Sequence, residues 1–92
     1  MSKQYTETDF QHIVNNLIDY LLECEDGTDI TTSQLLRAVG YDMDEFDDYN
    51  LMDIHDGLFK AAKTSHLILD MSAHENMVEG LPFNLDFIVY RS

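Results

Sequence analysis

The sequence predicts an α+β domain in which three helices are followed by a C-terminal antiparallel β-hairpin. Up to residue 65, most apolar residues recur every three or four positions, as they do on one side of a helix. After residue 65 the pattern changes to short runs that are rich in strand-forming residues and partly alternate. A chain of 92 residues has room for one modest core. We therefore expect residues 1–92 to form a single domain.

The first helix is expected over residues 9–24, after a loose N-terminal arm of residues 1–8. Thr8 and Gln11 have the spacing of a capping box, in which the hydroxyl accepts from an amide three residues on and the glutamine reaches back. Glu-Asp-Gly at residues 25–27 ends the helix. Its apolar stripe consists of Phe10, Ile13, Val14, Leu17, Ile18, Leu21 and Leu22.

A short extended piece at residues 28–31 precedes the second helix, and Ile30 within it is expected to point inward. Thr32 or Ser33 caps this helix, and Gly40 stands where a left-handed residue ends a helix. Because so short a helix is not stable alone in water, it must pack on the first helix. Its apolar residues are Leu35, Leu36, Ala38 and Val39.

The third helix is expected to begin at a cap formed by Asp48 or Asn50. Lys60 and Lys63 fall in its last turns, where cations interact favourably with the helix dipole. Gly57 is mildly unfavourable inside a helix, so its presence indicates close packing. The buried stripe of this helix consists of Leu51, Ile54, Leu58, Ala61 and Ala62.

Two strands are expected at residues 66–71 and 83–90, joined as an antiparallel hairpin by a long loop. One face of the second strand carries Phe83, Leu85, Phe87 and Val89. The loop is polar except for three apolar residues, which either contact a dimer partner or target protein or fold back under the loop. These candidate partner-binding residues are Met77, Val78 and Leu81.

The stretch at residues 38–59 is strongly acidic and contains no lysine or arginine. Its carboxylates are Asp42, Asp44, Glu45, Asp47, Asp48, Asp53 and Asp56. In the whole chain, 18 acidic residues against 5 basic ones give a formal net charge of -13. Such self-repulsion raises the free-energy cost of folding, and the same charge opposes binding to nucleic acid or to anionic membranes. We therefore expect the partner to be a protein with a basic surface, such as a nuclease that binds nucleic acid.

The spacing of these carboxylates also suggests how they would be used. Successive phosphates on one DNA strand lie about 7 Å apart, which is similar to the separation of carboxylates at i, i+3 or i, i+4 on a helix. Asp44 with Asp48, and Asp53 with Asp56, are spaced in this way. They are candidates to present a phosphate-like pattern to a basic groove. The alternative is a solvated face that only favours solubility.

The sequence contains no signature of catalysis, metal binding or cofactor binding. Read as a calcium loop from Asp42, the stretch has Phe46 where a ligand belongs and Asp47 where glycine belongs. The histidines lack HExxH spacing, Cys24 is the single cysteine, and no glycine-rich phosphate loop is present. We expect no enzymatic activity and no cofactor. A lone cysteine, the lack of an apolar signal core and the lack of a long apolar run favour a cytoplasmic protein.

The order helix, short strand, helix, helix and hairpin resembles the winged-helix fold over about residues 9–91. In winged-helix proteins that bind DNA, the third helix enters the major groove and the hairpin tip supplies basic residues. Here Asn50, Asp53 and Asp56 lie at the start of that helix, and residues 64–90 contain no lysine or arginine. In size, charge and lack of catalytic residues the chain also resembles small acidic phage-encoded inhibitors, which include DNA mimics and anti-CRISPR proteins.

Together these resemblances imply a non-catalytic protein-binding module. The expected function is that of an inhibitor whose acidic surface occludes a basic nucleic-acid-binding site on a target protein, without direct contact to nucleic acid or membrane. The alternative is a winged-helix transcriptional regulator, or an adaptor that forms homodimers, without strong DNA contact. An enzyme is the least favoured class.

Overall fold

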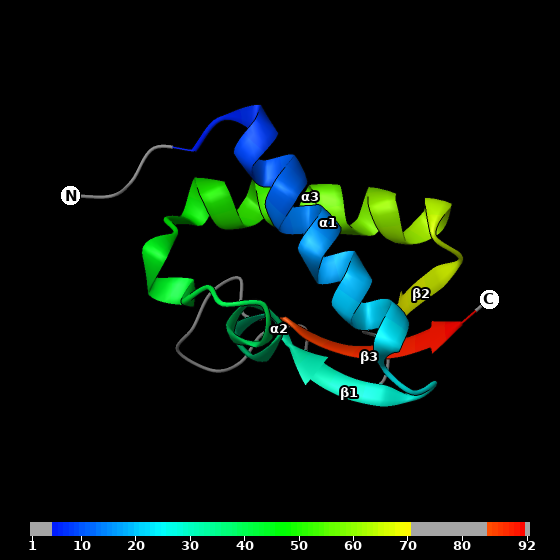
Figure 1. Cartoon of the computed structure of the whole chain (residues 1–92). Coiled ribbons are helices and arrows are strands. Elements are labelled where there is room, and N and C mark those ends of the chain that lie inside the picture. Colours follow the sequence, from blue (N-terminus) through cyan, green and yellow to red (C-terminus); the bar gives the residue numbers. More distant parts are fainter. Residues whose placement is uncertain (1–4, 71–84, 92) are drawn as a thin grey trace.

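The computed structural model describes residues 5–70 and 85–91, which form an α+β fold (Figure 1). The predicted fold class is confirmed at this level: these residues contain three α-helices and a three-stranded antiparallel sheet. The elements, in chain order, are α1 (Glu7–Glu23), β1 (Thr28–Thr31), α2 (Thr32–Ala38), the 3-10 helix η1 (Met43–Glu45), α3 (Asp48–Thr64), β2 (Leu67–Asp70) and β3 (Asp86–Arg91).

The sheet has the strand order β1-β3-β2, and β3 pairs antiparallel with both neighbours. Ile30 of β1 lies opposite Phe87, and Leu69 of β2 lies opposite Val89. The sequence predicted an extended piece at residues 28–31 with Ile30 inward, and Ile30 is buried, but it did not predict that this piece joins the sheet. Within the described residues, the predicted strands at 66–71 and 83–90 correspond to β2 and β3, and residues 71, 83 and 84 of the prediction lie outside the described part of the chain.

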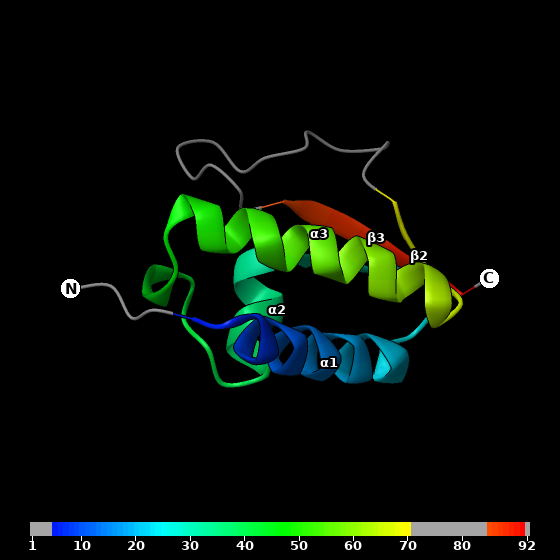
Figure 2. The same ribbon diagram turned by 90° about the horizontal axis from the view of Figure 1, so that it is seen from above.

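Helices α1 and α3 lie side by side, and the sheet packs against this pair while α2 lies near one end of the sheet (Figures 1 and 2). The core lies between these layers. On β3, the predicted inward face is confirmed at Phe87 and Val89, which are fully buried. The remaining buried apolar residues are Ile13, Val14, Leu17, Ile18, Leu21, Ile30, Leu35, Leu36, Phe46, Leu51, Ile54, Leu58, Ala62 and Leu67.

Helix α1 begins two residues before its predicted start. Its N-cap is Thr6, whose hydroxyl accepts from the Asp9 amide at 3.2 Å while the Asp9 carboxylate accepts from the Thr6 amide at 2.9 Å. The capping box predicted for Thr8 and Gln11 is therefore wrong, and the arm does not reach residue 8. Tyr5 packs against Phe10 with ring centroids 5.8 Å apart, and this contact across the cap fixes the earlier start.

The caps of the other two helices also precede the predicted residues. Thr31 caps α2 in a capping box with Gln34, so the prediction of Thr32 or Ser33 is wrong. Asp47 caps α3 by accepting from the Asn50 amide at 2.8 Å, so the prediction of Asp48 or Asn50 is wrong. In both cases the residue next to the cap, Thr32 beside Thr31 and Phe46 beside Asp47, is held in place by contacts with the rest of the fold. The Thr32 hydroxyl accepts the N–H of Leu85, the residue before β3, and Phe46 is buried in the core.

Other details of the helices follow the predictions more closely. Gly40 has φ +94°, which confirms its left-handed place after α2. Residues 43–45 form the 3-10 turn η1 in the acidic segment that connects α2 to α3, called the acidic connection below, and Phe46 beside this turn is buried. Two residues of the predicted apolar stripes, Leu22 at the end of α1 and Ala38 at the end of α2, are exposed. Both lie in the last turn of a helix, where the helix leaves the core.

Candidate functional site

All seven acidic residues predicted to bind a partner are exposed, but the carboxylates of three of them already accept a hydrogen bond from a nearby backbone amide. The Asp42 carboxylate accepts from the Asp44 amide at 3.1 Å, and the Glu45 carboxylate accepts from the Asp42 amide at 2.7 Å. Asp47 caps α3. These three residues stabilise the starts of η1 and α3, which accounts for part of the acidic composition without any partner.

The remaining four carboxylates are available to a partner. In residues 5–70 and 85–91, the side chains of Asp44, Asp48 and Asp53 make no hydrogen bond or ion pair. Asp56 pairs with Lys60 at 3.1 Å, but both side chains are exposed. An exposed pair of this kind contributes only about 0.3–0.5 kcal/mol, so Asp56 can exchange Lys60 for another cation.

An aromatic cluster holds the acidic connection in a fixed position. The Phe46 ring lies 5.0 Å from the Tyr5 ring and 6.1 Å from the Tyr41 ring, measured between centroids. Burial, followed by the negative charge of Glu45, raises the pKa of Tyr5. Because Phe46 is anchored in the core, the carboxylates on either side of it are presented from a folded backbone. A partner would therefore bind them with little loss of backbone entropy.

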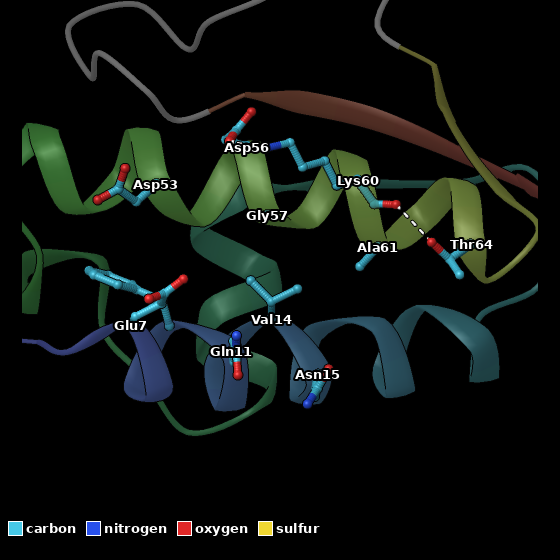
Figure 3. Close-up of a pocket in the computed structure, with 11 residues that line it drawn as sticks. Glu7, Gln11, Val14, Asn15, Asp53, Asp56, Gly57, Lys60, Ala61 and Thr64 are labelled. Atoms are coloured by element: carbon cyan, nitrogen blue, oxygen red, sulfur yellow. Dashed lines mark hydrogen bonds and ion pairs between the residues drawn. The ribbon is translucent and has the colours of Figure 1, made fainter.

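A groove of about 770 Å³ runs between α1 and α3 (Figure 3). It is lined by one face of each helix. The apolar residues of its lining, called its floor below, are Phe10, Val14, Gly57 and Ala61. Glu7 and Asp53 lie toward one end, and Thr64 lies toward the other (Figure 3). The sequence prediction included Asp53 and Asp56 as acidic residues but did not foresee a groove beside them.

Gly57 was the signal in the sequence that pointed to this region. A Cβ atom at Gly57 would lie 3.1 Å from Cγ2 of Val14, which is tighter than ordinary van der Waals contact. The expectation of close packing at Gly57 is therefore confirmed. The sequence could not identify Val14 as the residue that packs against Gly57, because Val14 lies on another helix, 43 positions away in the chain.

Two exposed apolar residues accompany the acids on α3. Tyr49 is 79% exposed and Met52 is 51% exposed. Each precedes an acidic residue by four positions, Asp53 and Asp56 respectively, and so shares a side of the helix with it. Sequence reasoning did not single out Tyr49 or Met52 as site residues. The candidate residues Met77, Val78 and Leu81 lie outside the described part of the chain.

A buried polar group lies away from the acidic surface. His55 is 6% exposed, and its Nε2 is 2.9 Å from the Thr32 hydroxyl oxygen. That oxygen also accepts the Leu85 N–H at 2.9 Å, so an arrangement in which the hydroxyl donates to Nε2 satisfies all three groups. Burial lowers the pKa of His55 to about 4, with a backbone hydrogen bond to Leu51 acting in the opposite direction. The neutral ring thus ties α3 to α2 and to the start of β3.

Within residues 5–70 and 85–91, no three His, Cys, Asp or Glu side chains are grouped in a way that could hold a metal ion. None of the helices in these ranges has both the length and the apolar character needed to cross a membrane.

Comparisons of the chain with models of known protein families, with curated proteins and with solved structures find no match.

Proposed function

We propose that this chain is a non-catalytic protein-binding module whose acidic surface binds a basic nucleic-acid-binding site on a target protein and occludes it. An inhibitor of the anti-CRISPR or DNA-mimic kind is the concrete form of this function. One observation carries the proposal: Asp44, Asp48 and Asp53 are exposed and unpaired within the described residues, on a folded scaffold of net charge -13.

The physical basis of the proposal is charge complementarity. Carboxylates that have no cation beside them repel one another, and a basic partner relieves that repulsion on binding. A site that normally holds phosphates offers lysine and arginine side chains as the counter-charges. Complementary fields of this kind mainly accelerate association and select the partner, and salt screens them.

We propose further that the scaffold is winged-helix-like, with β2 and β3 as the strands of a C-terminal hairpin. The strand order β1-β3-β2 and the sequence of three helices support this assignment. In DNA-binding members of that fold, the third helix reads the bases. Here the exposed side of α3 carries Asp53 and Asp56, which favours a protein partner over DNA.

A second candidate function is a regulator or dimerising adaptor on the same scaffold, without strong DNA contact. It is favoured by Tyr49 and Met52, because tyrosine and methionine are enriched at protein interfaces. In that case binding depends on these two side chains and changes little with salt. The two candidates therefore differ in a measurable way.

Replacing Asp44, Asp48 and Asp53 together with asparagine should slow association with the partner by about tenfold at low salt and change dissociation much less. The measurement is binding kinetics at two salt concentrations, against the partner recovered by pull-down from the host that encodes the chain. A matched control neutralises Asp19, Glu23 and Glu25, which are exposed on α1 and just after it. Equal slowing by both variants would indicate net charge alone, and parent-like binding of the first variant would refute the proposal.

A further inference from the structure

We propose that the groove between α1 and α3 binds a basic segment of the partner protein, with an arginine or lysine side chain of that segment lying along the groove. This inference deepens the proposed function and rests on it, since that function supplies a basic partner. It identifies one place on the acidic surface where shape and charge coincide.

The groove offers an apolar floor and a charged end to the same ligand. Its floor consists of Phe10 and Val14 from α1 and of Gly57 and Ala61 from α3. Arginine and lysine bury their methylene stems on apolar surface while their charged ends remain at polar groups. A volume of about 770 Å³ lies within the range of about 300–1,000 Å³ typical of ligand pockets, which leaves room for such a side chain and its neighbours.

Charge complementarity determines which kind of ligand fits. Glu7, Asp53 and Asp56 line the groove against one cation, Lys60, which pairs with Asp56. Glu7 and Asp53 have no cation at salt-bridge distance among the described residues, and both lie toward the same end of the groove (Figure 3). A guanidinium group between two carboxylates makes charge-assisted hydrogen bonds to both. A second copy of this acidic chain, or a nucleic acid, would instead meet repulsion there.

Gly57 lets the two helices that line the groove approach each other closely. The first atom of a side chain at this position would lie 3.1 Å from Cγ2 of Val14. Ala61 is the next small residue along the same side of α3, one helical turn further on. A large residue at Ala61 would occupy the groove from within while leaving every charge unchanged.

The test uses a short blocked peptide of alternating alanine and arginine, titrated into the full chain at low salt and followed by amide chemical shifts. The largest shifts are expected at Val14, Gly57 and Ala61. Ala61→Phe, which fills the groove, should weaken peptide binding by about tenfold, as should Glu7→Gln combined with Asp53→Asn. The second variant leaves the core packing intact, so the test remains decisive if Ala61→Phe does not fold. Asp19→Asn with Glu23→Gln, at exposed residues of α1 that do not line the groove, is the matched control and should change binding less than about twofold.

Two outcomes would overturn the inference while leaving the proposed function to its own test with the recovered partner. One is equal weakening by the two charge variants with no effect of Ala61→Phe, which would mean diffuse attraction to the acidic surface. The other is no measurable binding of the peptide to the parent chain. Failure of the proposed function is distinguishable, because it appears as salt-independent association with the partner.

Discussion

Replacing Phe87 with alanine is expected to lower the free energy of unfolding by about 3–5 kcal/mol. Phe87 is fully buried in the central strand, where its ring lies 5.8 Å from the Phe59 ring and 6.3 Å from the His55 ring. Removal of the ring leaves a cavity shared by α3 and the sheet. Domains of this size are stable by only about 5–15 kcal/mol, so the variant should be close to unfolding.

Urea denaturation of the Phe87→Ala variant measures this loss directly. The matched control is Ile68→Ala on the edge strand β2, because Ile68 is apolar but 49% exposed. The control should cost less than about 1 kcal/mol, since little apolar surface is uncovered. A loss at Phe87 as small as that at Ile68 would contradict the placement of β3 at the centre of the core.

The second large effect is a loss of stability in acid that depends on His55. The folded pKa of about 4 lies below the unfolded value of 6.5, so the unfolded chain binds a proton that the folded chain does not between these two pH values. The contribution of the neutral His55 to the free energy of unfolding is therefore present in full above pH 6.5. It is lost as the pH falls toward 4. A pKa difference of about 2.5 at about 1.4 kcal/mol per unit corresponds to about 3.5 kcal/mol in full, of which about 3 kcal/mol is lost by pH 4.

The comparison of parent and His55→Gln isolates this contribution from the carboxylates, which titrate in the same range in both proteins. Urea denaturation at several pH values between 7 and 4 gives the difference in unfolding free energy between the two. That difference should shrink by about 3 kcal/mol as the pH falls, because the parent alone carries the buried imidazole. A difference that stays constant with pH would show that His55 titrates normally in the folded protein.

Periodicity predicted the helices and the inward face of β3, but not where the helices begin. Thr6 with Asp9 and Thr8 with Gln11 both have a spacing that can form a capping box. The earlier start is stabilised by Tyr5, which packs on Phe10 across the cap and on Phe46 in the acidic connection, and the second of these contacts exists only after folding. The pairing of residues 28–31 with β3 likewise depends on partners nearly 60 positions away.

The candidate site was predictable in composition but not in detail. That the acids are exposed follows from the cost of burying charge, and all seven are exposed. Which carboxylates are used by the fold depends on the cap positions, so Asp42, Glu45 and Asp47 could not be separated from Asp44 and Asp48 in advance. The groove requires α1 and α3 to lie side by side, and sequence periodicity carries no information about that pairing.

Competition between this chain and nucleic acid for the same partner protein tests the proposed function most directly. The partner is first loaded with labelled nucleic acid, and the chain is then added at increasing concentration at low and at high salt. Occlusion predicts that the chain releases the nucleic acid, more effectively at low salt, and that the variant lacking the Asp44, Asp48 and Asp53 carboxylates releases little. A complex that holds the chain and the nucleic acid at the same time, with no loss of bound nucleic acid, would contradict it.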